Sequence, residues 1–333
     1  MVAPDIDALV EGIRSGDRRA LARAITLVES RRDDHRDQAN ELVRRIIPNT
    51  GDAIRLGISG APGVGKSTFI EAFGLHLTGA GHNVAVLAVD PTSKRSGGSI
   101  LGDKTRMEEL ARDPHAFIRP SPSGGTLGGV ARRTREAMLL CEAAGFDVVL
   151  VETVGVGQSE LAVADLVDLF VLLMSPGGGD ELQAIKRGIM ELADLVVITK
   201  ADGDLVARAK QACADARNAL HLLRPHHESI TPTALLVSST EGDGIPEAWS
   251  TIADAHATLG RSGELDRQRT AQRQAWLWSE VTEALTDRLR AHPKVAAMVD
   301  EVEAAVEAGS ESPVAAAQRL LAAFSEGQGK PPG

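Results

Sequence analysis

One stretch constrains the fold of this chain more than any other: Gly60-Ala61-Pro62-Gly63-Val64-Gly65-Lys66-Ser67-Thr68. It matches the pattern G-x-x-x-x-G-K-[ST], with a short apolar run before it and a helical pattern after it, the context that this motif requires. Backbone N–H groups of such a loop, with the N-terminus of the next helix, form a cradle for phosphate oxygens. We expect Lys66 to reach the β- and γ-phosphates and the Ser67 hydroxyl to ligate Mg²⁺. The alternative is a Gly-rich turn that binds nothing. The Lys-Ser pair at the correct offset disfavours it, so the sequence predicts a phosphate-binding loop.

Apolar segments alternate with helical patterns from Ile54 to about Leu259. Their nearly continuous Val, Ile and Leu runs are typical of strands that are buried on both faces of a mostly parallel sheet. Alternation with helices indicates βαβ units with right-handed crossovers, and it places ligands at the carboxyl ends of the strands. The predicted fold class is therefore α/β, a mostly parallel P-loop-type sheet flanked by helices. The predicted strands are Arg55–Ser59, Asn83–Val89, Ala116–Arg119, Asp147–Val151, Leu169–Met174, Leu195–Thr199 and Ala234–Ser238.

Three regions are predicted along the chain: a helical N-terminal extension (1–50), a P-loop domain (51–260) and a helical C-terminal arm (261–333). The first region reads as short amphipathic helices without residues that suggest chemistry. In the third region, Trp278 and Leu285 fall on one face of a long helix, but the apolar core is too small for independent stability. Exposed apolar faces of this kind often form dimers, and packing on the same chain is the alternative.

Composition and charge exclude several classes of function. A formal net charge of −10 over 333 residues argues against a general binder of nucleic acid or anionic membranes, since both need a basic surface. The N-terminal residues carry Asp, Glu and Arg and do not resemble a signal peptide. No apolar run approaches the roughly 18 residues of a membrane helix. Cys141 and Cys213 lie far apart without metal-ligand spacing, so free thiols are expected. We expect a cytoplasmic protein.

Acidic residues follow several predicted strands, where a nucleoside triphosphatase needs ligands for Mg²⁺. Glu152 comes directly after Val148-Val149-Leu150-Val151, at the position of a Walker-B carboxylate, and Gly155 could give a backbone N–H to the γ-phosphate. Asp90 ends the second strand, where it would face Mg²⁺ and the attacking water. Asp103 lies in a loop that could act as a first switch. Each acid alone could be a helix cap or a surface residue, and only the set indicates a magnesium site.

The segment Thr199-Lys200-Ala201-Asp202 follows a buried strand and resembles the guanine-reading element N/T-K-x-D. A carboxylate at Asp202 can accept from both the N1–H and the 2-amino group of guanine, and adenine offers no such pair. Lys200 would lay its stem over the base. Thr199 stands where Asn is more usual, and this shorter substitute could lose a contact. Ser238-Ser239-Thr240, at the next strand end, would complete the base pocket.

A glycine-rich loop runs from Ser175 to Lys186 and contains Gly177-Gly178-Gly179. Three successive glycines are entropically costly to order and suit a segment that changes conformation. Lys186 could bring a positive charge toward the transferred phosphoryl group, as an arginine finger does. A surface lysine on a helix is the alternative.

Four motifs occur in the order Gly-Ala-Pro-Gly-Val-Gly-Lys-Ser, Val-Asp-Pro-Thr-Ser, Gly-Asp-Lys-Thr-Arg-Met and Glu-Thr-Val-Gly-Val-Gly-Gln-Ser-Glu. Together they closely resemble the MeaB/MMAA (formerly ArgK) family of GTPases, within the SIMIBI class of P-loop proteins, and the resemblance covers nearly the whole chain. It implies a GTP-hydrolysing chaperone of an adenosylcobalamin-dependent methylmalonyl-CoA mutase, which gates cofactor loading and protects the mutase from inactivation. It also implies GTP or GDP with Mg²⁺ as ligands, and a homodimer formed through the C-terminal arm.

The resemblance further implies roles for individual residues. The phosphate and Mg²⁺ set would be Lys66, Ser67, Asp90, Asp103 and Glu152. Asp103 and Arg106 would fall in a first switch and residues 152–160 in a second. Residues 175–188 would form a third switch that responds to the mutase, with Lys186 as its charge-neutralising member. Two other hypotheses stay open: a P-loop ATPase or kinase of a small-molecule transport system, and a regulatory module with negligible turnover.

Overall fold

The computed structural model describes residues 5–30, 32–89, 107–120, 127–153, 159–177 and 187–325. The chain divides into two compact units, Met1–Thr270 and Ala271–Gly333. The first unit contains the N-terminal helices, the sheet and the start of a long helix. Within the described ranges, no helix combines the length and the apolar character needed to cross a membrane.

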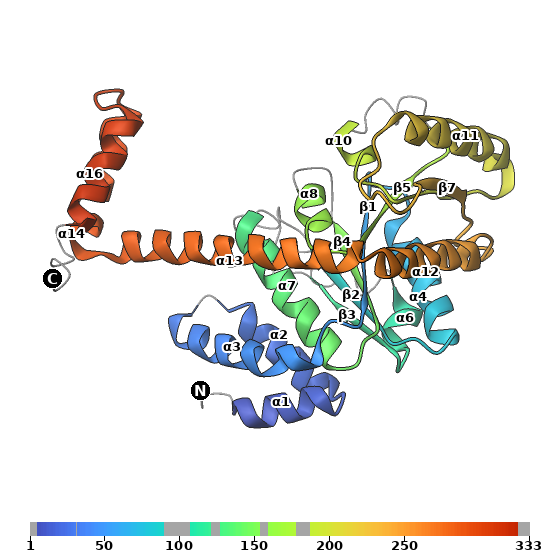
Figure 1. The fold of residues 1–333 in the computed structure, drawn as a ribbon, viewed down its shortest axis with the longest axis horizontal. Helices are drawn as coiled ribbons and strands as arrows, with labels where there is room; N and C mark the ends of the chain where they lie inside the picture. Colours follow the sequence, from blue (N-terminus) through green and yellow to red (C-terminus); the bar gives the residue numbers. More distant parts are fainter. Residues whose placement is uncertain are drawn as a thin grey trace. The chain divides into compact units, whose positions relative to one another are not determined.

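A seven-stranded sheet forms the centre of the first unit (Figure 1). Its strands are β1 (Ile54–Gly60), β2 (Val84–Val89), β3 (Ala116–Arg119), β4 (Val148–Thr153), β5 (Leu169–Met174), β6 (Leu195–Ile198) and β7 (Thr233–Leu236). The spatial order is β3-β2-β4-β1-β5-β6-β7, and every neighbouring pair is parallel. The α/β class predicted from the sequence is confirmed. The chain fills one side of β1 and then crosses to the other, so the carboxyl end of β1 lies at the point where open parallel sheets bind ligands.

Helices cover both faces of this sheet. One face packs against α4 (Lys66–Gly79), α6 (Glu108–Arg112) and α12 (Ile245–Ser262), and the other against α7 (Leu127–Ala143), α8 (Ser159–Ala164) and α11 (Val206–Leu222). Alternation along β5 shows the division, because successive side chains of a strand point to opposite faces. Leu173 belongs to the core under α4, whereas Leu172 and Met174 belong to the core under α11. Both faces are apolar, which explains the continuous Val, Ile and Leu runs of the strands.

The predicted N-terminal helices are present as α1 (Ile6–Arg14), α2 (Arg18–Val28) and α3 (Asp33–Ile46). Asp5 and Asp17 cap the first two, each carboxylate accepting hydrogen bonds from backbone N–H groups of the first turn. Ile13, Leu21 and Ile25 are completely buried, and α2 and α3 pack against α7. Shorter helical elements are η1 (Ile47–Asn49), α10 (Arg187–Met190) and η2 (Gly203–Leu205).

The second unit consists of helices only. It contains most of α13 (Glu264–Ala291), followed by α14 (Pro293–Ala296), α15 (Val299–Glu307) and α16 (Pro313–Ser325). The Ser312 hydroxyl accepts from the Ala315 N–H at 3.2 Å and caps α16, with Pro313 in its first turn. Among the described residues of this unit, the buried apolar side chains are those of Val295, Val302 and Ala316. This is a small core for a unit of this length.

The first two turns of α13 are bound to the end of the sheet at which strands β1 and β5 begin. Arg269 donates to both carboxylate oxygens of Asp168 at 2.8 and 2.7 Å, and to the carbonyl of Ala53 at 2.7 Å. Asp168 also accepts from the backbone N–H of Arg55 at 2.8 Å. Gln268, one residue before Arg269, donates to the carbonyl of Val167 at 3.1 Å. These contacts join α13 to the starts of β1 and β5.

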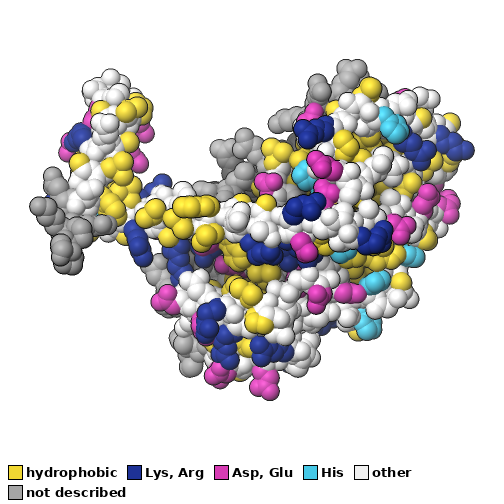
Figure 2. All heavy atoms as spheres, in the orientation of Figure 1, with side chains coloured by type: hydrophobic (Ala, Val, Ile, Leu, Met, Phe, Trp, Pro, Cys, Tyr) yellow, Lys and Arg dark blue, Asp and Glu magenta, His cyan; other side chains and the backbone are white. Residues whose placement is uncertain are grey.

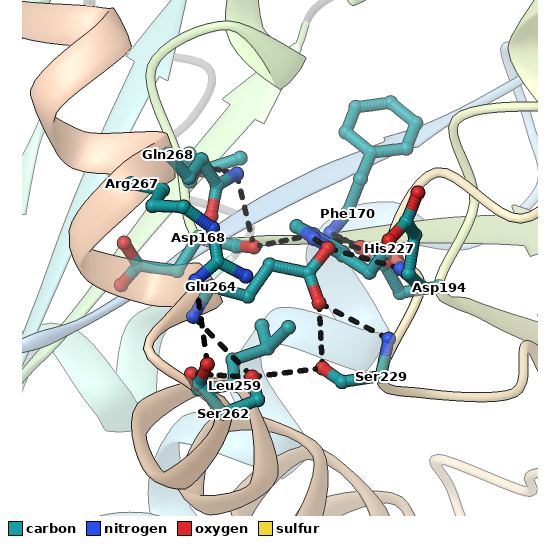
Figure 3. A network of polar contacts seen from close by, with 12 residues as sticks. Asp168, Phe170, Asp194, His227, Ser229, Leu259, Ser262, Glu264, Arg267 and Gln268 are labelled. Carbon is teal, nitrogen blue, oxygen red and sulfur yellow. Dashed lines mark hydrogen bonds and ion pairs between the residues drawn. The ribbon is translucent and has the colours of Figure 1, made fainter.

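Glu264, the first residue of α13, binds the segment that precedes β7 (Figure 3). Its carboxylate accepts from the Ser229 hydroxyl at 2.6 Å and from the N–H groups of Glu228 and Ser229 at 2.9 and 3.1 Å. Desolvation acts against the charge, but these hydrogen bonds and the nearby His227 lower the pKa of Glu264 to about 2. The carboxylate therefore stays ionised and holds the α12–α13 junction across the physiological range.

A second buried acid, Asp194, lies close to this network (Figure 3). One carboxylate oxygen accepts from the Phe170 N–H at 2.8 Å, and the other is buried without a hydrogen-bond partner among the described residues. His227 Nε2 lies 3.8 Å from that second oxygen. Burial and the negative charge of Glu264 raise the pKa of Asp194 to about 8.

We expect the Asp194→Asn variant to lose part of the pH dependence of stability. The folded protein keeps the Asp194 proton up to about pH 8, whereas the unfolded chain releases it near 3.8, so this contribution to stability is complete below 3.8 and is lost as the pH rises to about 8. The asparagine oxygen still accepts from Phe170 but does not titrate. Thermal unfolding between about pH 4 and about pH 8 should therefore show a smaller fall in Tm for Asp194→Asn than for the unsubstituted chain. The exposed Asp254→Asn is the control, and equal pH profiles for all three proteins would contradict the assignment.

Candidate nucleotide-binding site

The predicted phosphate loop connects the carboxyl end of β1 to the N-terminus of α4. Gly65 is the N-cap of α4 and has a φ of 99°, a left-handed conformation that favours glycine. At Gly60 the constraint is space, because a Cβ there would lie 2.6 Å from the carbonyl oxygen of Leu173 in the adjacent β5. The glycines of the motif therefore allow a tight turn against a neighbouring strand. Such a turn presents backbone N–H groups and a helix N-terminus to a phosphate.

Lys66, the first residue of α4, folds back over the loop. Its Nζ donates to the carbonyl oxygens of Gly60 at 2.8 Å and of Ala61 at 3.3 Å. Burial lowers the pKa of Lys66, and the negative charges of Glu152 and Glu160 act in the opposite direction. The ammonium group thus lies at the mouth of the loop. A phosphate oxygen could take the place of the two carbonyl oxygens as its hydrogen-bond acceptor.

Glu152 lies on the strand beside the loop. It is the fifth residue of β4, paired in register with Ile58 of β1, and its side chain is buried. Ser67, the second residue of α4, is half-buried. A hydroxyl and a carboxylate at adjacent strand and helix ends are the hard oxygen ligands that Mg²⁺ prefers. Among the described residues, no group of three or more His, Cys, Asp or Glu side chains could hold a metal ion; the other two predicted acids, Asp90 and Asp103, lie outside them.

The predicted base pocket brings together the ends of β6 and β7. Asp202 accepts from the Ser238 hydroxyl at 2.5 Å and from the Thr240 hydroxyl at 3.2 Å through the same carboxylate oxygen. Ser239, between them, is half-buried. Lys200 has a φ of 54°, unusual for a residue other than glycine, and its Nζ donates to the carbonyl of Gly63 at 2.8 Å. The lysine stem therefore spans from the predicted base pocket to the phosphate loop.

Comparison with known proteins identifies the family to which this chain belongs. The family model described as "Methylmalonyl Co-A mutase-associated GTPase MeaB" matches residues 21–294. This chain belongs to the MeaB family. The resemblance inferred from the four motifs is thereby confirmed, and so is the enzyme class of a GTPase.

Relatives of this MeaB-family chain include named proteins from animals and bacteria. The mouse protein "Methylmalonic aciduria type A homolog, mitochondrial" is 50% identical over 329 residues, which cover 96% of this chain and 79% of the mouse protein. "GTPase ArgK" of Escherichia coli is 51% identical over 283 residues, or 85% of this chain and 86% of that protein. A crystal structure described as "LAO/AO transport system kinase" superposes with a TM-score of 0.74 at 40% identity, covering 96% of this chain and 98% of that one.

Thr199 contributes more in this MeaB-family structure than its length suggests. Its hydroxyl lies 2.6 Å from the carbonyl of Val64 in the phosphate loop and 3.2 Å from that of Met174 at the end of β5. The side chain is almost completely buried. The sequence alone left open a lost contact at this position, but the hydroxyl reaches the loop directly. Among the described residues, Thr199 and Lys200 both join the phosphate loop to the predicted base pocket.

We expect Thr199→Val to weaken GDP binding about fivefold, the effect of one hydrogen bond of ordinary strength. Valine has nearly the shape of threonine but cannot donate to Val64, so the loop loses one of its links to the predicted base pocket. Fluorescence titration with a labelled GDP measures the affinity. Thr199→Ser retains the hydroxyl and is expected to bind within about twofold of the unsubstituted protein. Equal loss in both variants would show that packing, rather than the hydroxyl, matters here.

Four predicted site residues lie outside the described residues: Asp90, Asp103, Gly155 and Lys186. The same is true of Arg106 and of most of the predicted third switch. Their assignments stay predictions. One buried acid that had no role of its own in the sequence analysis, Glu160 of α8, affects Lys66 electrostatically. Its position at the end of the motif Glu-Thr-Val-Gly-Val-Gly-Gln-Ser-Glu is the signal that could have singled it out.

Proposed function

We propose that this GTPase is a chaperone of an adenosylcobalamin-dependent methylmalonyl-CoA mutase, assisting cofactor loading and protecting the mutase. The observation that supports the proposal most is the double link between phosphate loop and base pocket, through Thr199–Val64 and Lys200–Gly63, in a chain of the MeaB family. Through this link, the binding of a base at Asp202 and the number of phosphates on the nucleotide would both affect the conformation of the phosphate loop. A nucleotide-dependent regulator needs such a connection.

The chemistry of the pocket suits guanine. Asp202 is held by two hydroxyls at its Oδ2, and a carboxylate in that place can accept from the N1–H and the 2-amino group of guanine. Thr199, Ser238 and Ser239 would form the walls around it. Lys66 and the N–H groups of residues 60–68 would bind the phosphates.

The donor set also fits Mg²⁺, since Ser67 and Glu152 offer hard oxygen ligands beside the loop. Asp90 and Asp103 would complete it. A bound Mg²⁺ would supply charge neutralisation between the phosphates, and this chain would supply orientation through Lys66 and the loop amides. The ligand roles of all four residues are part of the proposal.

The homodimer belongs to the proposal too, and the apolar surface of the second unit supports it. Trp278 is 68% exposed, Leu277 60% and Leu285 53%, all on α13, and Figure 2 shows hydrophobic side chains along this helix. On α16, Val314 and Leu321 are exposed as well. A second copy of the chain would cover these faces and enlarge the small core of this unit, in which three of the described apolar side chains are buried. The cytoplasmic location stays a prediction from the sequence.

Hydrolysis of GTP with and without a purified cobalamin-dependent mutase tests the proposal. We expect the mutase to raise the turnover, and we expect Lys186→Ala to bind GTP almost normally while losing most of that stimulation. If no cobalamin mutase changes the turnover, the hypothesis of a regulatory module with negligible turnover takes its place.

Calorimetric titration with GTP, GDP and ATP tests which base the protein binds. Tight binding of ATP without binding of GTP would favour the kinase hypothesis.

A further inference from the structure

Two buried hydroxyls lie side by side at the ends of β1 and β4. Thr153 Oγ1 donates to Ser59 Oγ at 2.8 Å. Ser59 is 2% exposed and Thr153 is completely buried. A buried hydroxyl costs free energy unless it finds a partner, and an apolar side chain of similar size would avoid this cost. The residues of β1 and β4 that precede this pair are mostly apolar, so the two hydroxyls call for a reason other than packing.

The position of the pair suggests that reason. Ser59 directly precedes Gly60, the first residue of the phosphate loop, and Thr153 directly follows Glu152. Glu152 pairs in register with Ile58, which belongs to the core under α4, so its side chain points to the α4 face of the sheet. Thr153 points to the opposite face. The hydroxyl pair thus joins the ends of β1 and β4 on the face opposite α4. The Glu152 side chain lies on the α4 face and acts electrostatically on Lys66, the first residue of α4.

Helix α8, which follows in the chain, is also seated on β1. A Cβ at Gly57 would lie 3.1 Å from Val163 of α8 and 2.9 Å from Phe170, so the absence of a side chain allows this close approach. Glu160, one turn before Val163, is buried and acts electrostatically on Lys66. The segment from Glu152 to α8 therefore contacts β1, the strand that precedes the phosphate loop, at both of its described ends: through Thr153 and through α8.

We infer that Ser59 and Thr153 are a positioning pair for GTP hydrolysis, which sets the Glu152 carboxylate relative to the phosphate loop. The pair acts through Glu152, so the inference rests on the proposed role of that carboxylate in Mg²⁺ binding. A misplacement of about 1 Å at a catalytic group can lower a rate about a hundredfold. Loss of one hydroxyl in a packed sheet shifts a strand end by less, and its effect should be correspondingly smaller.

The test compares Thr153→Val, Thr153→Ser and Ser59→Ala with the unsubstituted full-length protein. For Thr153→Val we expect kcat to fall about tenfold and the Mg²⁺ concentration for half-maximal rate to rise about fivefold, with GDP affinity within about twofold. Ser59→Ala should show the same pattern, and Thr153→Ser should restore both values because it keeps the hydroxyl. Thr78→Val is the matched control. It removes another buried threonine hydroxyl, one that donates to Asp113 at 2.6 Å at the far end of α4.

Four outcomes overturn the inference. If Thr153→Val and Ser59→Ala only lower Tm, as Thr78→Val does, with unchanged kcat and Mg²⁺ dependence, the pair is merely structural. If Thr153→Ser is as impaired as Thr153→Val, packing is responsible and not the hydrogen bond. Glu152→Gln separates this inference from the proposed site: if that variant loses hydrolysis and Thr153→Val does not, the site stands and the positioning pair falls. If Glu152→Gln hydrolyses GTP normally, the proposed role of Glu152 falls, and the pair with it. Should Thr153→Val not fold, Ser59→Ala alone decides.

Discussion

Lys66→Ala is expected to weaken GTP binding about a hundredfold and to abolish measurable hydrolysis, while the chain stays folded. The ammonium group lies at the mouth of the loop, and each charge-assisted hydrogen bond that it makes to a phosphate is worth about 1.5–3 kcal/mol. Burial lowers the pKa of Lys66, which means that the folded protein stabilises this charge poorly without a nucleotide. Removing it should therefore cost little stability. The two carbonyls that it contacts belong to Gly60 and Ala61, in a loop that solvent can reach.

Calorimetry with GTP and GDP, together with a thermal melt, measures both parts of this prediction. The control is Lys210→Ala, which removes an exposed lysine from α11 and should change neither affinity nor Tm. Normal hydrolysis by Lys66→Ala would mean that the loop is not the nucleotide site. Loss of folding would mean that the lysine is a structural residue, and the affinity would then carry no information about phosphates.

Arg269→Met is expected to lower the free energy of unfolding by about 3–5 kcal/mol, the usual cost of breaking one side of a buried ion pair. Asp168 has no exposed side-chain surface, so the variant would leave its carboxylate charged and buried. It would also remove the donors to Gly51 and Ala53. Burial alone would raise the pKa of Asp168, but the hydrogen bonds and the charge of Arg269, together with His256, whose Nε2 lies 3.6 Å from the carboxylate, lower it to about 2.

Chemical denaturation of the full-length chain measures this loss. Arg267→Met is the matched control, because Arg267 lies two residues earlier on the same helix and is exposed. Asp168→Leu combined with Arg269→Met should recover part of the loss, since the double variant leaves no buried charge without a partner. Equal stability of Arg269→Met and Arg267→Met would contradict the assignment. In the unsubstituted protein, the contribution of Asp168 is present above 3.8 and is lost as the pH falls through about 2.

Much of the fold could be predicted from the sequence because its strands are buried on both faces. Continuous apolar runs and the helices between them place all seven strands to within two residues at each end. The largest differences are at β4, which extends to Thr153, and at β7, which ends at Leu236 rather than at Ser238. Strand ends depend on where hydrogen bonding to a neighbour stops, and an apolar pattern does not contain this information.

The candidate site could be predicted in its parts but not in its connections. Local motifs name Lys66, Glu152 and Asp202, because each depends on residues close by in the chain. That Thr199 reaches the phosphate loop, 135 residues away, follows only from the parallel neighbours β1, β5 and β6. The same holds for Ser59 and Thr153, whose hydroxyls meet because β4 is inserted beside β1.

The sequence by itself determined the phosphate loop of residues 60–68, the parallel sheet behind it and the family, since these depend on short-range patterns of glycine, charge and apolar residues. Tertiary structure decided what holds the loop in place and what fastens the long helix. Asp168 and Arg269 are 101 residues apart and unremarkable in the sequence. They become a pair only when the start of β5 and α13 are brought together. Folding buries both charges, and a buried charge without a partner costs several kcal/mol.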